Sequence, residues 1–114
     1  MFTKNFSLMK NQNLINALNA CIAACNYCAS KCLSEDDVKM MADCIRTDII
    51  CAEVCATTAK LVAMDSSSAA EIVALCQKIC KECGDECAKH DHEHCQKCAE
   101  ACRKCEEACQ AYAA

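Results

Sequence analysis

The chain has 114 residues, a formal net charge of −4, 16 cysteines, one glycine and no proline. This length suits a single domain, which we expect to cover residues 1–114 with residues 1–12 fraying. No apolar run approaches the ~20 residues of a membrane-spanning helix. The acidic balance also lacks the basic surface typical of nucleic-acid-binding proteins. We therefore expect neither a membrane nor a nucleic acid as partner.

The cysteine content is well above the ~8–10% that marks a chain whose structure depends on sulfur. A secreted disulfide scaffold is one explanation. However, the first 13 residues contain no long apolar segment typical of a signal peptide. Disulfide scaffolds are also rich in turns, and cysteines that are neighbours on a helix seldom all reach disulfide geometry. These features favour a cytoplasmic protein with reduced thiols, and the disulfide scaffold remains the alternative.

Most cysteines recur at steps of three, four and seven residues, which places each group on one stripe of an α-helix. The sixteen are Cys21, Cys25, Cys28, Cys32, Cys44, Cys51, Cys55, Cys76, Cys80, Cys83, Cys87, Cys95, Cys98, Cys102, Cys105 and Cys109. The first helix is predicted from about Ser7 or Lys10 to Leu33. Ser34 is a natural N-cap for a second helix that runs to about Met64.

The segment 65–68 is the clearest break, and a third helix is predicted after it, ending near Lys89 or His90. Gly84 lies inside this helix between two cysteines, which indicates a close contact with another helix. The fourth helix is predicted from about Asp91 to Tyr112.

Short connections favour an all-α, antiparallel, up-down-up-down four-helix bundle with a cysteine-lined core. The connections 33–35 and 89–91 then lie at one end, and the connection 64–68 lies with both termini at the other. The end with the termini is predicted to be closed by Leu14, Leu18, Leu61, Val62, Ile72, Leu75 and Tyr112. The opposite end is predicted to be an open mouth with Met40, Met41, His90, His92 and His94.

Geometry, charge and softness all favour Cu(I) as the metal for such a core. Cβ atoms one helical turn apart are ~5–6 Å from each other, and two thiolates on one metal span about 4.6 Å, so a nearly linear S–Cu–S unit fits. Sixteen thiolates with sixteen Cu(I) ions leave no net charge, whereas four Zn(II) sites of four thiolates each leave eight negative charges. Thiolate and thioether ligands also select Cu(I). We expect about one Cu(I) per cysteine.

Other functions remain as alternatives. A zinc, cadmium or general thiol buffer would also use these ligands. Iron–sulfur ligation usually takes a C-x2-C-x2-C-x3-C-P run on loops, which differs from the 3-2-3 steps on helices here. A thiol redox enzyme needs one exposed, activated cysteine rather than an internal row. No arrangement of residues typical of catalysis is present, so we do not expect an enzyme.

Residues 76–109 carry the most specific pattern, CxxxCxxCxxxCAKHDHEHCQKCAxxCxxCxxxC, with a His-Asp-His-Glu-His stretch before Cys95. This pattern resembles the bacterial cytosolic copper storage proteins, a family of cysteine-lined four-helix bundles. The resemblance covers about residues 20–112. It implies storage of many Cu(I) ions inside each bundle, entry at one open end and assembly into a homotetramer. The copper donor and acceptor are not indicated.

Some side chains near the predicted mouth continue the inner stripes. His90 follows Cys87 by three residues, and His92 precedes Cys95 by three. We predict both as metal ligands together with Met41; a solvated histidine cluster and simple core packing are the alternatives. His94 and Met40 fall off the stripes. Asp48 occupies a stripe position, and we expect it at the rim, bonded to Arg46 or to a lysine.

Overall fold

A computed structural model describes residues 2–113, with side chains described for residues 8–9 and 11–112. The chain forms four α-helices: α1 (Phe2–Leu33), α2 (Ala42–Ala63), α3 (Ala69–Ala88) and α4 (Glu93–Ala113). A short 3₁₀ helix, η1 (Val38–Met41), precedes α2. The described part of the chain contains no strand. The predicted all-α class is therefore confirmed.

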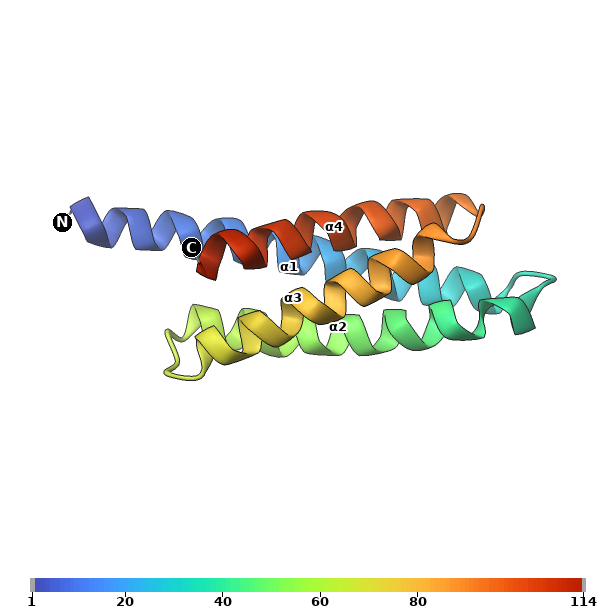
Figure 1. The fold of residues 1–114 in the computed structure, drawn as a ribbon, viewed down its shortest axis with the longest axis horizontal. Coiled ribbons are helices and arrows are strands. Elements are labelled where there is room, and N and C mark those ends of the chain that lie inside the picture. The colour runs from blue at the N-terminus through green and yellow to red at the C-terminus, as the bar shows by residue number, and fades with distance from the viewer. Residues whose placement is uncertain (1, 114) are drawn as a thin grey trace.

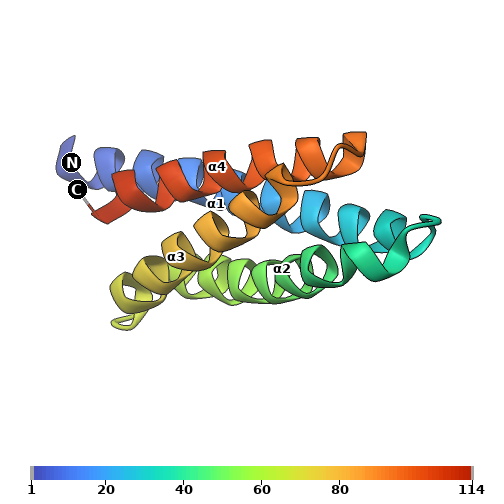
Figure 2. The same cartoon turned by 45° about the vertical axis from the view of Figure 1, so that its right-hand side comes forward.

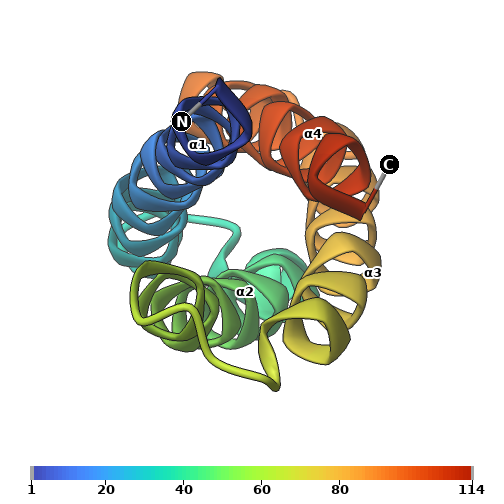
Figure 3. The same ribbon diagram turned by 90° about the vertical axis from the view of Figure 1, so that its left-hand side faces the viewer.

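The helices surround one central axis in the order α1, α2, α3, α4, and α4 packs back against α1 (Figure 3). The bundle is elongated, with extents of 55 × 20 × 18 Å. Both termini and the α2–α3 turn lie at one end, and the α1–α2 and α3–α4 connections lie at the other (Figure 1). This is the up-down-up-down arrangement that short connections dictate.

Helix α1 begins at Phe2, several residues before the predicted start at Ser7 or Lys10. The segment between has no glycine or proline, so nothing in it breaks a helix. With 32 residues, α1 is about ten residues longer than its partners, and its N-terminal turns extend past the end of α4 (Figures 1 and 2). The expected fraying of residues 1–12 includes Met1, which lies outside the described residues.

The prediction that Ser34 caps the second helix is wrong. The amide of Ser34 donates to the carbonyl of Lys31 at 3.0 Å, so Ser34 closes the last turn of α1 instead. The segment 34–37 then crosses the end of the bundle before η1, and α2 starts only at Ala42. Two carboxylates of this segment, Glu35 and Asp37, pair with His92 of the α3–α4 connection, which holds the segment over the mouth.

The closed end is apolar as predicted, but the contribution of α3 differs. Leu14, Leu18 and Val62 are fully buried. On α3 the buried residues at this end are Ala69 and Val73, whereas Leu75 is 48% exposed. Val73 lies three residues before Cys76 on the same stripe, whereas Ile72, four residues before Cys76, is only partly buried.

Gly84 lies at the contact between α3 and α4, as its sequence position predicts. A Cβ atom at this residue would lie 3.3 Å from Cys102 Cβ and 3.6 Å from the carbonyl oxygen of Ala99. The missing side chain therefore lets the two cysteine-bearing helices approach closely.

Candidate metal centre

All sixteen cysteines are free and fully buried, and they form the larger part of the core. Helix α1 supplies four, α2 three, α3 four and α4 five. Every helix turns its cysteine stripe inward, as the spacing predicts. Cysteine packs as a small hydrophobic residue, so a metal-free core of thiols is compatible with a folded bundle.

The thiols contact one another across helices as well as along them. Cys21 Sγ lies 3.8 Å from both Cys51 Sγ of α2 and Cys102 Sγ of α4. Similar contacts connect Cys28 with Cys95 at 3.9 Å near the mouth. At the closed end they join Cys55 to Cys76 at 3.8 Å. The thiols thus form a continuous column along the axis.

Four-residue groups within the column bring ligand atoms within 4.8 Å of one another. One group combines Cys21, Cys55, Cys80 and Cys105, one from each helix. With metal–sulfur bonds of ~2.3 Å, sulfurs are about 3.8 Å apart in a tetrahedral site, about 4.0 Å in a trigonal one and about 4.6 Å in a linear one. Four sulfurs converge in this group because each of the four helices contributes one, so a tetrahedral site is geometrically possible as well as a linear one. Charge and softness, rather than geometry, distinguish Cu(I) from Zn(II) here.

Asp48 lies inside the thiol column and not at the rim, which corrects the sequence prediction. Its Oδ1 atom accepts hydrogen bonds from the thiols of Cys83, Cys87 and Cys98 at 3.2–3.3 Å. The expected partner Arg46 lies outside the core and pairs with Asp43 at 2.7 Å. The position of Asp48 on the inner cysteine stripe of α2 indicates burial, whereas its polar side chain alone suggests the rim.

Burial, followed by the negative charges that Cys98 and Cys83 carry when they ionise, raises the pKa of the Asp48 carboxyl to about 12. Asp48 is therefore neutral at pH 7 in the metal-free protein. Burial similarly raises the pKa of the Cys32 thiol to about 11 and raises that of Cys95. These groups must lose protons before they can bind a cation, so metal binding releases protons.

His94 is the imidazole that reaches the thiols. Its Nδ1 atom lies 3.5 Å from the Sγ atoms of Cys28 and Cys95 and 3.9 Å from that of Cys32. These four residues form one of the groups able to hold a metal ion. Its Nε2 atom lies 3.4 Å from Glu35 Oε1 but is not aligned with any described residue for a hydrogen bond. The sequence did not predict the contact of His94 with the thiols, because His94 does not continue the inner cysteine stripe of its helix.

The predicted ligands His90 and His92 occupy the same end but make other contacts. His90 Nε2 pairs with Glu86 Oε2 at 2.9 Å. The ring nitrogens of His92 face Glu35 Oε2 at 3.2 Å and Asp37 Oδ1 at 3.3 Å. The ring of His92 stacks on that of His94, with centroids 5.3 Å apart.

The two methionines at the mouth differ as the sequence suggests. Met41 is fully buried and belongs to the same core cluster as the cysteines. Met40, one step aside, is 75% exposed. Met41 is therefore the buried thioether at the mouth end of the core.

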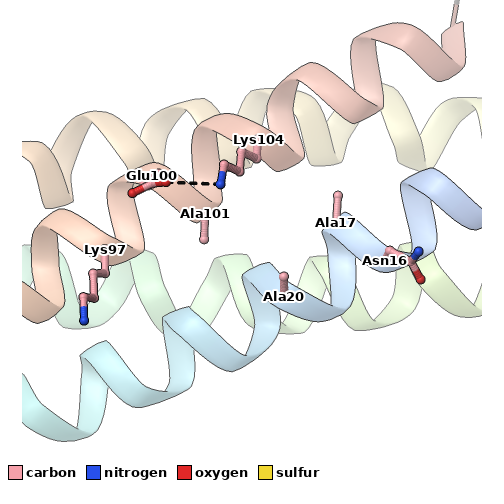
Figure 4. A pocket seen from close by; sticks show the side chains of 7 residues that line it. All are labelled: Asn16, Ala17, Ala20, Lys97, Glu100, Ala101 and Lys104. Carbon is pink, nitrogen blue, oxygen red and sulfur yellow. Dashed lines mark ion pairs between the residues drawn. The ribbon is translucent and has the colours of Figure 1, made fainter.

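One hollow of about 540 Å³ lies outside the core, between α1 and α4. Alanines line its floor, and the exposed pair Glu100–Lys104 lies along its edge (Figure 4). No cysteine lines this hollow. It is a surface groove rather than an opening into the thiol column.

Comparisons with known proteins agree on one family. A sequence model described as copper storage protein matches residues 7–114. An uncharacterized cysteine-rich protein of Bacillus subtilis, YhjQ, is 49% identical over 85 residues, which are 75% of this chain and 79% of that protein.

Two solved structures share the fold at high identity. The Cu(I)-bound copper storage protein BsCsp3 superposes with a TM-score of 0.88 at 47% identity, covering 92% of this chain and 99% of that one. A cytosolic copper storage protein from Streptomyces lividans, described with five coppers, gives a TM-score of 0.93 at 40% identity and 96% coverage of both chains.

None of the described helices is long and apolar enough to cross a membrane. The family model matches nearly the whole chain, and both solved structures superpose on its four-helix bundle. The chain belongs to the copper storage protein family.

Proposed function

We propose that this protein stores Cu(I) in the cytosol by binding it to thiolates inside the bundle, and that it is not an enzyme. The observation that carries the proposal is the continuous column of sixteen buried, free cysteines. The related structures support it, since one contains Cu(I) and another is described as a cytosolic protein loaded with copper.

Charge balance explains why such a column can be filled. Each Cu(I) ion replaces one thiol proton, so the interior stays neutral at one copper per cysteine. Divalent ions bound by four thiolates would leave two negative charges at each site in a medium of low dielectric constant. Soft thiolate ligands favour Cu(I) for the same sites.

The proposed route begins at the mouth, the end of the bundle that carries segments 34–41 and 89–92. His94 contacts Cys28, Cys32 and Cys95, so an ion bound there can pass to a thiolate by ligand exchange. The next thiol along the column is that of Cys44, whose Sγ atom lies 4.0 Å from Cys28 Sγ and 3.9 Å from Cys95 Sγ. The predicted ligands His90, His92 and Met41 remain part of this proposal as groups that bind copper on entry.

Asp48 is proposed to act with the thiols one level below the mouth. It forms a group with Cys28, Cys87 and Cys98 whose ligand atoms lie within 4.8 Å of one another. As copper displaces protons from these thiols, the carboxyl can lose its own proton and balance a local excess of positive charge. A neutral Asp48 fits the empty state, and an ionised one fits only a level of the column at which copper ions outnumber thiolates.

We also propose that the chain assembles with copies of itself, as a homotetramer by resemblance. Exposed isoleucines on α2 support an apolar contact surface: Ile49 is 57% exposed and Ile50 is 50% exposed. Light scattering of the parent and of an Ile49→Lys, Ile50→Lys variant tests the proposal. A monomeric parent would contradict it.

Anaerobic titration with Cu(I) tests storage directly. We expect saturation near one copper per cysteine, about sixteen per chain. A Cys→Ser series serves as a matched control, because capacity should fall with each group of thiols removed. Saturation near a quarter of this value, with Zn(II) held as tightly as Cu(I), would overturn the storage function.

A zinc or cadmium buffer is the second candidate, and one observation favours it. Sulfur separations of 3.8–3.9 Å within groups such as Cys21, Cys25, Cys51 and Cys102 are close to the edge of a tetrahedral site. Competition between Zn(II) and Cu(I) in the same titration separates the two functions. Displacement of Zn(II) by stoichiometric Cu(I) supports copper storage.

A further inference from the structure

Two histidines and one carboxylate meet at the mouth, outside the thiol column. Glu35 lies in the segment between α1 and η1, His92 in the α3–α4 connection and His94 in the first turn of α4. The two connections lie at the same end of the bundle (Figure 1). Glu35 Oε2 lies 3.2 Å from His92 Nδ1, and Glu35 Oε1 lies 3.4 Å from His94 Nε2. Each carboxylate oxygen thus faces one imidazole nitrogen.

The other nitrogen of each ring already has a partner for its proton. Asp37 Oδ1 accepts a hydrogen bond from His92 Nε2 at 3.3 Å. His94 Nδ1 lies 3.5 Å from two thiol sulfurs of the column. A neutral imidazole carries one proton, so with the protons on these two nitrogens the lone pairs of His92 Nδ1 and His94 Nε2 are on the side of Glu35. Metal-binding histidines are commonly oriented in this way, by a hydrogen bond from the nitrogen that does not bind the metal.

His94 Nε2 is a buried polar atom without a hydrogen-bond partner among the described residues. Its side chain is only 8% exposed, so water has little access to it. Buried polar atoms are rarely left in this state. A lone pair beside a carboxylate oxygen is repelled unless a cation lies between them. In the part of the chain that the structure describes, neither Glu35 nor Asp37 pairs with a lysine or an arginine. The cluster therefore offers ligand atoms to a positive ion.

The spacing of these atoms fits a small divalent cation. Zn(II) binds imidazole nitrogen and carboxylate oxygen at about 2.0–2.2 Å, so neighbouring ligand atoms of a tetrahedral site are about 3.3–3.5 Å apart. The observed N–O separations of 3.2 and 3.4 Å are close to this range. Nitrogen and oxygen ligands suit Zn(II), whereas Cu(I) prefers the sulfur ligands of the column. The His92 side chain is 32% exposed, so its ring can turn toward an ion held by Glu35 and His94.

We propose that Glu35, His92 and His94 bind one divalent cation of the Zn(II) class, and that this ion latches the mouth over the filled column. The inference rests on the proposed storage of Cu(I). The ion connects the segment 34–37 with the α3–α4 connection and the start of α4. Because this segment crosses the end of the bundle, fixing it slows the passage of copper. His94 keeps its Nδ1 atom for the thiol side and uses only Nε2 for the latch.

Zinc binding is measured on protein that has first been filled to capacity with Cu(I) under anaerobic conditions, so that the thiols are occupied. Zn(II) is then titrated in competition with a chromophoric zinc indicator. We expect about one tightly bound Zn(II) per chain, and none in a Glu35→Gln variant. Copper is counted after the titration, because Zn(II) should displace none of it. A cluster that consists only of ion pairs between histidines and carboxylates would bind no zinc.

The latch itself is tested by copper removal with a Cu(I)-selective chelator, with and without Zn(II). Free Zn(II) at about ten times its Kd favours the latched mouth about tenfold, so removal from the parent should be about tenfold slower. The ratio of the two rates is compared within each protein, because Glu35→Gln also loses the ion pairs with the histidines. This ratio should be close to one in the variant.

Glu93→Gln is the matched control. Glu93 directly precedes His94 and the substitution removes the same charge, but this carboxylate pairs with Lys97 at 2.9 Å rather than with a histidine. The control should bind zinc and be slowed by it as the parent is. A parent that binds no zinc, equal zinc binding by Glu35→Gln, or removal rates that do not depend on zinc would overturn the proposal.

The copper endpoint separates this inference from the storage function. A parent that does not fill to about one Cu(I) per cysteine contradicts storage itself, and the latch with it. A full endpoint with removal rates that do not depend on zinc contradicts only the latch. The two failures are therefore distinguishable.

Discussion

Replacing Asp48 with asparagine should remove a strong dependence of stability on pH from the metal-free protein. Asp48 is fully buried and its pKa is raised to about 12, whereas an aspartate in the unfolded chain has a pKa near 3.9. Between these values the folded carboxyl holds a proton that the unfolded one has lost. Unfolding therefore releases a proton, and the free energy of unfolding falls as the pH rises.

The size of the effect follows from this linkage. One proton contributes about 1.4 kcal/mol per pH unit, so from pH 5 to pH 8 Asp48 lowers the free energy of unfolding by about 4 kcal/mol. Asparagine has nearly the same shape and no charge, and its amide oxygen can still accept from the thiols of Cys83, Cys87 and Cys98. The variant should gain about 4 kcal/mol relative to the parent over this range.

Urea unfolding of reduced, metal-free protein at pH 5, 6, 7 and 8 measures the difference. Taking the difference between variant and parent cancels the contributions that the two proteins share. Asp43→Asn is the control, because Asp43 is exposed and pairs with Arg46 on the surface. A stability difference that does not change with pH would refute the assignment of Asp48 as a buried neutral acid.

Three further outcomes are expected. Circular dichroism of reduced metal-free protein should show a largely helical chain, since the core packs without metal; a coil that becomes helical only with copper would contradict this. Replacing Met41, His90 and His92 with alanine should slow copper uptake or copper removal by a chelator, while capacity falls only slightly. His94→Ala should slow copper uptake more, because His94 contacts the thiols. Equal rates in parent and variants would exclude the mouth assignment. Gly84→Leu should destabilise the protein by about 1–3 kcal/mol through overpacking. Gly84→Ala should leave the thermal unfolding temperature nearly unchanged, because a gain of about 1 kcal/mol in helix propensity offsets the close 3.3 Å contact of the new Cβ atom with Cys102.

The helices and their inward faces could be predicted because cysteine spacing reports helical periodicity directly. All sixteen cysteines lie where their stripes place them, and Met41 is buried while Met40 is exposed. The breaks at 65–68 and 89–92 also lie within a few residues of their predicted positions. Local sequence determines these features.

The features that were missed depend on contacts between distant segments. Segment 34–37 is drawn across the mouth by His92, which is more than fifty residues away, so a local capping rule at Ser34 could not describe it. His94 reaches the thiols from a flanking position because α4 begins there at Glu93. The burial of Asp48 depends on thiols of α3 and α4 that hydrogen-bond its carboxyl, and the sequence around Asp48 does not show these contacts.

The longitudinal arrangement of the core has a consequence for how such proteins diversify. The thiols of α1 occupy the twelve-residue span from Cys21 to Cys32, which is about 16 Å of helix, although the bundle is 55 Å long. Where α1 continues alone toward its N-terminus, it carries no cysteine. Adding one heptad to every helix would create a new level that all four helices enclose, with room for several more sulfurs. Capacity in this architecture can therefore change by small insertions of matched length, without a new fold or a new mouth.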